Sequence, residues 1–341
     1  MTAPVVEGLD LDVLDRFLAD RVPDYAGGLR AELVSGGRSN LTYTLTDGVS
    51  TWILRRPPLG VLTPSAHDMA REFRVVEALH GHGVPVAPPV ALADADVLGV
   101  PFAVVGFVDG VVIRSEEDLD PLSDADVRRC ADGLVDTLAA LHAVDPAAVG
   151  LADFGRPEGY LGRQVRRWYG QWERVRTRDL PDVEALHARL EAACPAESGA
   201  AIVHGDFRID NTILDPADPA RVRAVVDWEM ATLGDPLADL ALHVVYGDRE
   251  FGAVLGGSAA STSPRIPGAD ALVERYARAS GREITDLGFH LGLAYFKIAV
   301  IAEGIHERHL RGDTRGDGFS TVGAATAPLA AAGLTTLGGT R

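Results

Sequence analysis

The sequence predicts an α+β fold in two unequal parts, a small antiparallel sheet crossed by one helix and a larger helical part. Two observations lead to this prediction. Within the first 105 residues, short runs with alternating apolar side chains are separated by turn residues, which is typical of hairpin strands. Beyond that point, most periodic segments repeat apolar residues at helical spacing. We therefore expect domains at 1–105 and 106–341, with the Gly-bounded segment 106–110 as a hinge.

The elements of the first part follow in order. An amphipathic helix is expected over 9–22, and a second one over 67–80. The Asp47-Gly48 pair is a turn signal between two strands. The expected strands cover 29–34, 41–46, 51–56, 90–94 and 100–105.

The second part is predicted to be mostly helical. Its expected helices cover 123–143, 158–176, 182–194, 237–246, 269–280, 286–310 and 318–333. Ser123 is a suitable N-cap for the first of them. On the second helix Arg163, Arg166 and Arg167 share one face, which is either solvated or an anion site; the sequence leaves both readings open.

Composition limits the classes of partner. The chain has 341 residues, of which 47% are hydrophobic, and a formal net charge of −17. Nucleic acids and anionic membranes require clustered cations, so neither is expected as the main partner. The N-terminus lacks the pattern of a signal peptide, and the apolar stretch 291–302 is interrupted by Lys297 and too short to span a bilayer. We expect a cytoplasmic location.

Two polar segments in the second part follow apolar runs. Residues 204–211 read His-Gly-Asp-Phe-Arg-Ile-Asp-Asn, and residues 225–229 read Val-Val-Asp-Trp-Glu. In phosphoryl transfer by kinases, an Asp in the spacing H-x-D-x-x-x-x-N accepts the proton of the acceptor hydroxyl, and the Asn and a later Asp hold Mg²⁺. Asp206, Asn211 and Asp227 fit these positions. Ordinary Asp-rich turns are the alternative, but two such segments in this order favour catalysis.

Nucleotide-binding residues are expected in the first part. The Gly-rich turn 36–40 can bring main-chain N–H groups onto phosphates, and we assign this role to Gly37, Ser39 and Asn40. Such residues are also common in hairpin turns, so the signal depends on the downstream motifs.

Strand periodicity separates the two adjacent arginines of 51–56. Arg55 takes the place of the lysine in the Val-Ala-Ile-Lys pattern, and Arg56 points to the opposite face. Glu72, on the following helix, is the expected ion-pair partner of Arg55, with a solvated helix face as the alternative. Gly106 and Val108, in the hinge segment, complete the predicted nucleotide-binding set.

With these residues assigned, the sequence resembles the superfamily of aminoglycoside phosphotransferases and choline kinases, which are small-molecule kinases. The resemblance covers nearly the whole chain. The matching segments read Gly36–Tyr43, Ile53–Pro58, Leu141–Asp145, His204–Asn211, Asp227–Glu229 and Gly234–Asp239. The helix containing Arg163 to Trp168 resembles that of one branch of this superfamily, whose members also occur as the kinase part of proteins fused to acyl-CoA dehydrogenases.

This resemblance implies a bilobal protein-kinase-like fold and ATP- and Mg²⁺-dependent phosphorylation of a small-molecule hydroxyl, such as that of a hydroxyacyl-CoA. It implies that Asp206 is the catalytic base and that His204 braces the loop by hydrogen bonding. Asp239 would fix the catalytic loop from below, and Glu229 would reach either the metal shell or the substrate. Arg55 departs from the family lysine; it keeps the charge but has more bulk, which leaves a preference for ATP over GTP open.

The sequence favours a small-molecule kinase over two other functions. A protein kinase would need Asp-Phe-Gly and Ala-Pro-Glu segments around an activation loop, and the sequence lacks both. A nucleotide-binding regulatory pseudokinase would not need the full set of acidic groups that the chain carries. The oligomeric state is not readable from the sequence.

Overall fold

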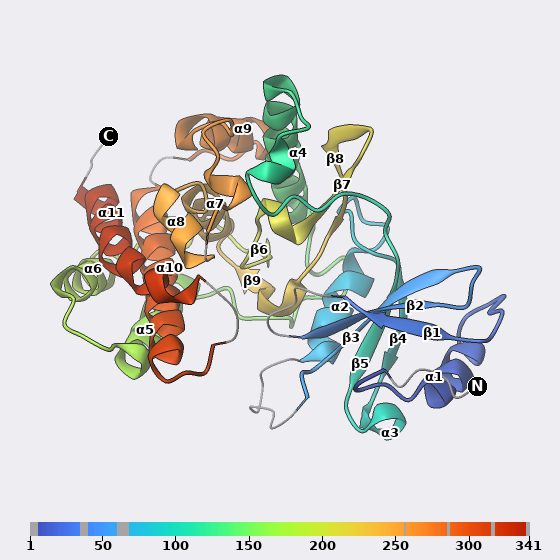
Figure 1. Cartoon of the computed structure of the whole chain (residues 1–341). Coiled ribbons are helices and arrows are strands. Elements are labelled where there is room, and N and C mark those ends of the chain that lie inside the picture. Colours follow the sequence, from blue (N-terminus) through green and yellow to red (C-terminus); the bar gives the residue numbers. More distant parts are fainter. Residues whose placement is uncertain are drawn as a thin grey trace. The chain divides into compact units, whose positions relative to one another are not determined.

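The structure is a computed structural model that describes residues 6–34, 40–59, 68–255, 257–284, 287–314 and 318–338. By their contacts, the residues form two compact units (Figure 1). The first is Met1–Asp109 with Arg223–Glu229, and the second is Gly110–Val222 with Met230–Arg341. The first division lies within the predicted hinge segment, four residues beyond the predicted limit at 105. The return of 223–229 to the first unit was not foreseen.

A five-stranded antiparallel sheet with the order β1-β2-β3-β5-β4 forms the centre of the first unit. This arrangement confirms the predicted α+β class. Asp47 closes the β2–β3 turn by accepting hydrogen bonds from the main-chain N–H groups of Val49 (2.9 Å) and Ser50 (2.7 Å). The strands are β1 (Arg30–Leu33), β2 (Leu41–Thr46), β3 (Thr51–Arg56), β4 (Pro89–Ala93) and β5 (Phe102–Gly106).

The two faces of the sheet carry different helices. Trp52 and Leu54 of β3 are buried in one apolar cluster with residues of α1 (Leu11–Ala19). Residues of a strand alternate between faces, so Arg55 lies on the other face, where it contacts α2 (Met69–Leu79). Alternation along a single strand thus separates the core from a charged site.

Helices make up most of the second unit, and α10 lies at its centre. This helix packs against α5, α6, α7 and α11 (Figure 1). Among the described residues it is also the one helix that is long and apolar enough to cross a membrane. However, 67% of its most apolar stretch is buried, and a buried core helix can have the same length and composition. The helices are α4 (Asp124–Ala143), α5 (Tyr160–Val175), α6 (Pro181–Ala192), α7 (Pro236–Val245), α8 (Arg249–Val254), α9 (Ala269–Ser280), α10 (Gly288–Leu310) and α11 (Thr326–Gly338).

Two small sheets support the motif loops. Strand β6 (Ala201–Val203) pairs antiparallel with β9 (Thr232–Gly234), and β7 (Thr212–Asp215) pairs with β8 (Asp218–Val225). All three residues of β6 are buried. The loop after β6 therefore begins from a fixed, apolar position.

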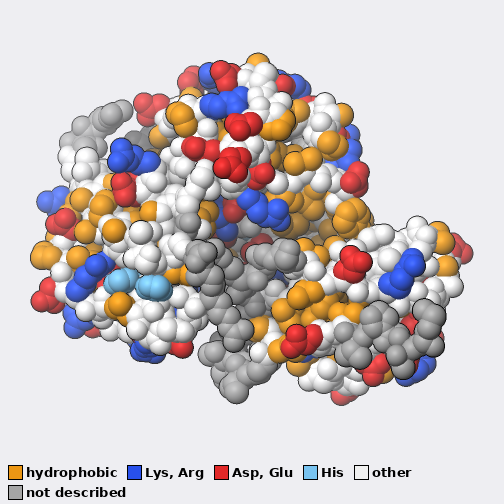
Figure 2. Space-filling view, in the orientation of Figure 1, with side chains coloured by type: hydrophobic (Ala, Val, Ile, Leu, Met, Phe, Trp, Pro, Cys, Tyr) orange, Lys and Arg blue, Asp and Glu red, His pale blue; other side chains and the backbone are white. Residues whose placement is uncertain are grey.

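Several short elements were not predicted. These are α3 (Ala95–Leu98), α8, β7 and β9, each of six residues or fewer. The single closing helix predicted at 318–333 is wrong at its start, because a 3₁₀ helix over Phe319–Ala325 precedes α11. On the face shown in Figure 2, acidic and basic side chains are interspersed among the described residues.

Candidate active site

The loop between β6 and β7 carries the first motif. Its second residue, Gly205, has φ +79°, and a Cβ placed there would lie 2.8 Å from the main-chain oxygen of Met230. Positive φ and this close approach both require glycine. The 3₁₀ turn Ile209–Asn211 then leads into β7. Glycine therefore sets the path that carries Asp206 to its position.

Asp239, in the first turn of α7, holds this loop. Its carboxylate accepts hydrogen bonds from the main-chain N–H groups of His204 (2.7 Å) and Gly205 (2.9 Å). His142 of α4 lies 3.3 Å from the same carboxylate. Burial acts to raise the pKa of Asp239, but the hydrogen bond and charge of His142 and the charge of His204 outweigh it, so the pKa is lowered. An ionised carboxylate thus ties the loop to α7 and α4.

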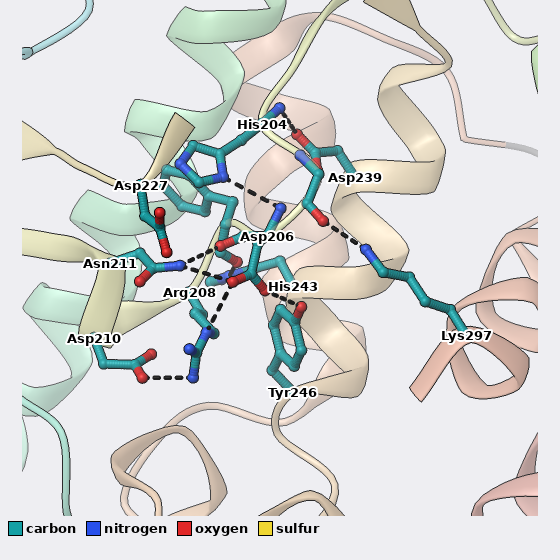
Figure 3. Close-up of polar contacts among 12 residues, drawn as sticks. His204, Asp206, Arg208, Asp210, Asn211, Asp227, Asp239, His243, Tyr246 and Lys297 are labelled. Carbon is teal, nitrogen blue, oxygen red and sulfur yellow. Dashed lines mark hydrogen bonds and ion pairs between the residues drawn. The ribbon is translucent and has the colours of Figure 1, made fainter. Parts of the chain in front are cut away.

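Two more contacts fix the main chain beside Asp206 (Figure 3). The N–H of Asp206 donates to Nδ1 of His204 (3.2 Å), and Nζ of Lys297 donates to the carbonyl oxygen of Gly205 (2.6 Å). The Lys297 ammonium also lies 5.5 Å from the ring centroid of Trp168. His204 and Asp239 make the bracing contacts that the resemblance implies, and their effect on catalysis stays a prediction.

Both oxygens of the Asp206 carboxylate are engaged (Figure 3). Oδ1 accepts a hydrogen bond from the hydroxyl of Tyr246, while Oδ2 accepts from Nδ2 of Asn211 (3.0 Å) and Nε of Arg208 (3.4 Å). Asn211 Nδ2 also donates to the Asp206 carbonyl oxygen (2.8 Å). The side chain of Asp206 remains 26% exposed. It is therefore both oriented and accessible, as a base needs to be.

The first unit holds a separate charged cluster. Arg55 Nε lies 2.8 Å from Glu72 Oε1, and Arg55 Nη2 donates to Asp227 Oδ1 at 2.9 Å. The predicted Arg55–Glu72 ion pair is thus confirmed. Burial raises the pKa of Glu72 to about 7, although the Arg55 charge opposes the shift and the charges of Asp227 and Glu229 add to it. Asp227 has φ +67°, a left-handed conformation that Asp tolerates better than most residues.

The other predicted nucleotide-binding residues belong to the Gly-rich turn 36–40 and to the predicted hinge segment. Gly37 and Ser39 lie outside the described residues, and Asn40 is buried just before β2. Gly106 ends β5 and donates its N–H to the carbonyl oxygen of Pro88 (2.7 Å). Val108 is half-buried in the following segment. Their role in nucleotide binding stays a prediction.

A cavity of about 470 Å³ lies in the second unit, and two residues that contact Asp206, Arg208 and Tyr246, line it. Asp248, its one lining carboxylate, accepts hydrogen bonds from the Tyr295 hydroxyl (2.8 Å) and the Glu250 N–H (2.9 Å). Most of the other lining residues are apolar: Leu119, Val127, Cys130, Ala131, Leu134, Ile209, Val244, Pro264, Ile266, Pro267, Ala269 and Leu272.

The three arginines of the predicted 158–176 helix do not line this cavity. The guanidinium of Arg163 donates instead to the carbonyl oxygens of Glu158 and Arg156. The cavity therefore gives no support to the anion-site reading of that helix face.

Sequence reasoning missed Arg208, Tyr246 and Lys297. Arg208 lies inside the recognised motif and was visible there. Lys297 was visible as the sole lysine of the chain, but nothing in its surroundings indicated a loop 92 residues away. Tyr246 reaches Asp206 across 40 positions and has no local signal.

The donor chemistry of this chain suits Mg²⁺. The amide nitrogen of Asn211 is used in hydrogen bonds, which leaves its amide oxygen as a ligand, and Asp227 offers a carboxylate on the first unit. Within the described ranges, no group of three His, Cys, Asp or Glu residues could hold a metal ion. Few protein ligands, with phosphates and water in the other positions, are typical of Mg²⁺.

Comparisons with known proteins identify the family of this chain. The model of the phosphotransferase enzyme family matches residues 30–290. "Acyl-CoA dehydrogenase family member 11" of Gallus gallus is 35% identical over 337 residues, covering 95% of this chain and 43% of that protein. The human protein of the same name is 34% identical over 303 residues, covering 87% of this chain and 39% of that protein. The chain thus spans less than half the length of these curated relatives.

Solved structures show the same fold. The crystal structure of a candidate aminoglycoside phosphotransferase from Ralstonia eutropha JMP134 has a TM-score of 0.83 and 33% identity, covering 96% of this chain and 98% of that one. A thermostable mutant of an aminoglycoside phosphotransferase, in a ternary complex with AMP-PNP and hygromycin B, has a TM-score of 0.61 and 15% identity over 96% of this chain and 99% of that one, which shows the fold alone. The family match and the 33% identical structure establish that this chain belongs to the phosphotransferase enzyme family.

Proposed function

We propose that the chain transfers the γ-phosphoryl group of ATP, in the presence of Mg²⁺, to a hydroxyl of a small molecule. One observation carries the proposal: Asp206 is oriented by hydrogen bonds, partly exposed, and bonded to two residues that line a cavity of about 470 Å³. Membership of the phosphotransferase enzyme family supports phosphoryl transfer, and a neighbour with the same fold was solved with AMP-PNP and hygromycin B bound.

The proposed chemistry assigns one task to each group. The oxygen of the acceptor hydroxyl attacks the γ-phosphorus, and the bond between the γ-phosphorus and ADP breaks. Asp206 accepts the proton of this hydroxyl. Asn211 and Asp227 would supply oxygen ligands to Mg²⁺, which when bound would neutralise charge on the phosphate oxygens. Arg55, held by Glu72, binds phosphate with the Gly-rich turn 36–40. His204 and Asp239 keep the loop in place, and Glu229 stays assigned to either the metal shell or the substrate.

The lining of the cavity supports an acceptor with an apolar body. A polycationic aminoglycoside would need several carboxylates, whereas Asp248 is the one carboxylate among the lining residues and already accepts two hydrogen bonds. The names of the curated relatives point to acyl-CoA chemistry. We therefore propose a hydroxyacyl-CoA as the acceptor class.

The base assignment is tested with Asp206→Asn and Asp206→Ala. We expect turnover to fall at least about 100-fold, because a positioned base contributes factors of this size, while AMP-PNP affinity changes by less than about threefold. Asp145→Asn, an exposed carboxylate elsewhere on the second unit, is the matched control. Near-normal turnover in either Asp206 variant would show that another group is the base.

The acceptor is tested with a panel of 2-, 3- and 4-hydroxyacyl-CoA esters, aminoglycosides, choline-like amines and sugars, using [γ-³²P]ATP. We expect transfer to one or more hydroxyacyl-CoA esters and none to aminoglycosides. Transfer to an aminoglycoside alone would contradict the acceptor class but not the phosphotransferase activity. Tight MgATP binding without transfer to any acceptor or to water would favour the nucleotide-binding regulator.

A further inference from the structure

Tyr246 is a buried side chain for which neither the motifs nor the proposed chemistry assigns a task. It caps the C-terminal end of α7 and is 4% exposed. Its ring centroid lies 4.5 Å from that of Phe251 on α8, and its carbonyl oxygen accepts a hydrogen bond from Ser261 Oγ (2.7 Å). Neighbouring elements therefore fix both the ring and the main chain, and the hydroxyl is held against Asp206 Oδ1 (Figure 3).

The hydrogen bonds distinguish the two oxygens of the Asp206 carboxylate. Each carboxylate oxygen offers two lone-pair directions. Among the described residues, Oδ2 accepts from two donors, Asn211 and Arg208, whereas Oδ1 accepts from Tyr246 alone. Oδ1 therefore keeps a free lone pair, whereas Oδ2 does not; each oxygen is bonded to one residue of the cavity wall, Oδ1 to Tyr246 and Oδ2 to Arg208.

We propose that Tyr246 is a positioning residue for phosphoryl transfer, which holds the Asp206 carboxylate so that Oδ1 receives the proton of the acceptor hydroxyl. This inference rests on the proposed function of Asp206 as base. As the new O–P bond forms and the P–O bond to ADP breaks, the acceptor's proton moves to Oδ1, and solvent later removes it. Tyr246 keeps its own proton throughout.

Two properties of Tyr246 suit this task. Burial, together with the charge of Asp206, raises the pKa of its hydroxyl, so the phenol remains a donor at neutral pH. Tyr246 also lines the cavity, so an acceptor bound there meets the phenol, whose hydroxyl contacts the Asp206 carboxylate. The tyrosine thus connects acceptor binding to the orientation of the base.

The test compares steady-state MgATP hydrolysis, with water in place of the acceptor, for the wild type, Tyr246→Phe, Tyr25→Phe and Asp206→Asn. Tyr25 is the matched control, because its hydroxyl donates to the Asp15 carboxylate (2.7 Å) in the first unit. For Tyr246→Phe we expect kcat to fall about tenfold, with KM for MgATP within about twofold, since an orienting contact acts on turnover more than on binding. Tyr25→Phe should keep both values.

An unchanged kcat in Tyr246→Phe, with Asp206→Asn inactive, would overturn the positioning role and leave the base assignment intact. A rise in KM at constant kcat would reduce Tyr246 to a binding contact and also overturn it. Full activity of Asp206→Asn would remove the proposed base and this inference together. If Tyr246→Phe does not fold, Phe251→Leu loosens the tyrosine ring but retains its hydroxyl; we expect a several-fold lower kcat at unchanged KM, and a wild-type kcat would contradict the proposal.

Discussion

At the scale of residues, Arg55 and Arg56 show how one position in a strand decides a function. Arg55 contacts Glu72 and Asp227, whereas Arg56 is buried on the other face and donates to the carbonyl oxygens of Gly8 and Pro57. The two arginines have different partners because side chains alternate between the two faces along β3, with a period of two residues. The pair therefore provides two substitutions of equal chemistry at sites with different partners.

We expect Arg55→Ala to weaken AMP-PNP binding by roughly 10- to 100-fold, the loss that follows removal of a charge-assisted phosphate contact. Arg56→Ala should change the affinity by less than about threefold, although it should lower the melting temperature by removing buried contacts. Isothermal titration calorimetry with Mg²⁺ and AMP-PNP measures both affinities. Equal losses in the two variants would contradict the assignment of Arg55.

Glu72 predicts a dependence of stability on pH. Its pKa is about 7 in the folded chain, against 4.5 for the free group, so the folded state binds this proton more tightly than the unfolded state. The stabilisation is complete below pH 4.5 and is lost as the pH rises through 7. Between pH 5 and pH 8, the unfolding free energy of Glu72→Gln should fall less than that of the wild type, by on the order of 1–3 kcal/mol. Chemical denaturation at several pH values measures it, and parallel curves for wild type and variant would contradict the shifted pKa.

At the scale of elements, sequence periodicity predicted the long segments and missed the short ones. Strands 41–46 and 51–56 were predicted to the residue, since both alternate and flank an Asp-Gly turn. Strands β7 and β9 have four and three residues, too few to show a period. In addition, β9 pairs with β6, a distant segment of the chain. The same limit applies to the site, because Asp206 and Asn211 share one motif, whereas the contact from Tyr246 exists only after α7 has packed.

Two glycines with positive φ, Gly205 in the loop after β6 and Gly150 outside it, should respond differently to substitution by alanine. At Gly150, with φ +74°, an added Cβ meets nothing within 4 Å, so Gly150→Ala should cost only about 1–2 kcal/mol of backbone strain. At Gly205 the same strain is joined by the clash with the Met230 main chain. Gly205→Ala should therefore cost about 3 kcal/mol or more and lower turnover, because it displaces Asp206.

Thermal denaturation and steady-state kinetics of both glycine variants separate strain from displacement. Gly150→Ala should keep wild-type kcat while losing some stability. If Gly205→Ala matched it in both stability and kcat, the path of the loop would not depend on glycine in the way described above.

At the scale of the whole molecule, the net charge of −17 opposes the arrival of an anionic nucleotide. Short-range contacts such as those of Arg55 act after encounter, whereas the summed charge acts over distances near the Debye length, about 10 Å at 0.1 M salt. MgATP is itself an anion, so association proceeds against repulsion when the ionic strength is low. The same repulsion applies to the phosphates of a CoA ester.

The rate constant for MgATP association should accordingly rise, by about two- to threefold, between 20 mM and 150 mM NaCl, because added salt screens like charges. Stopped-flow measurements with a fluorescent ATP analogue give this rate directly, and an uncharged viscogen controls for changes in diffusion. Dissociation should change less, since it depends on contacts already formed. A rate that falls with salt would mean that the local cations around the nucleotide, rather than the charge of the whole chain, dominate the encounter.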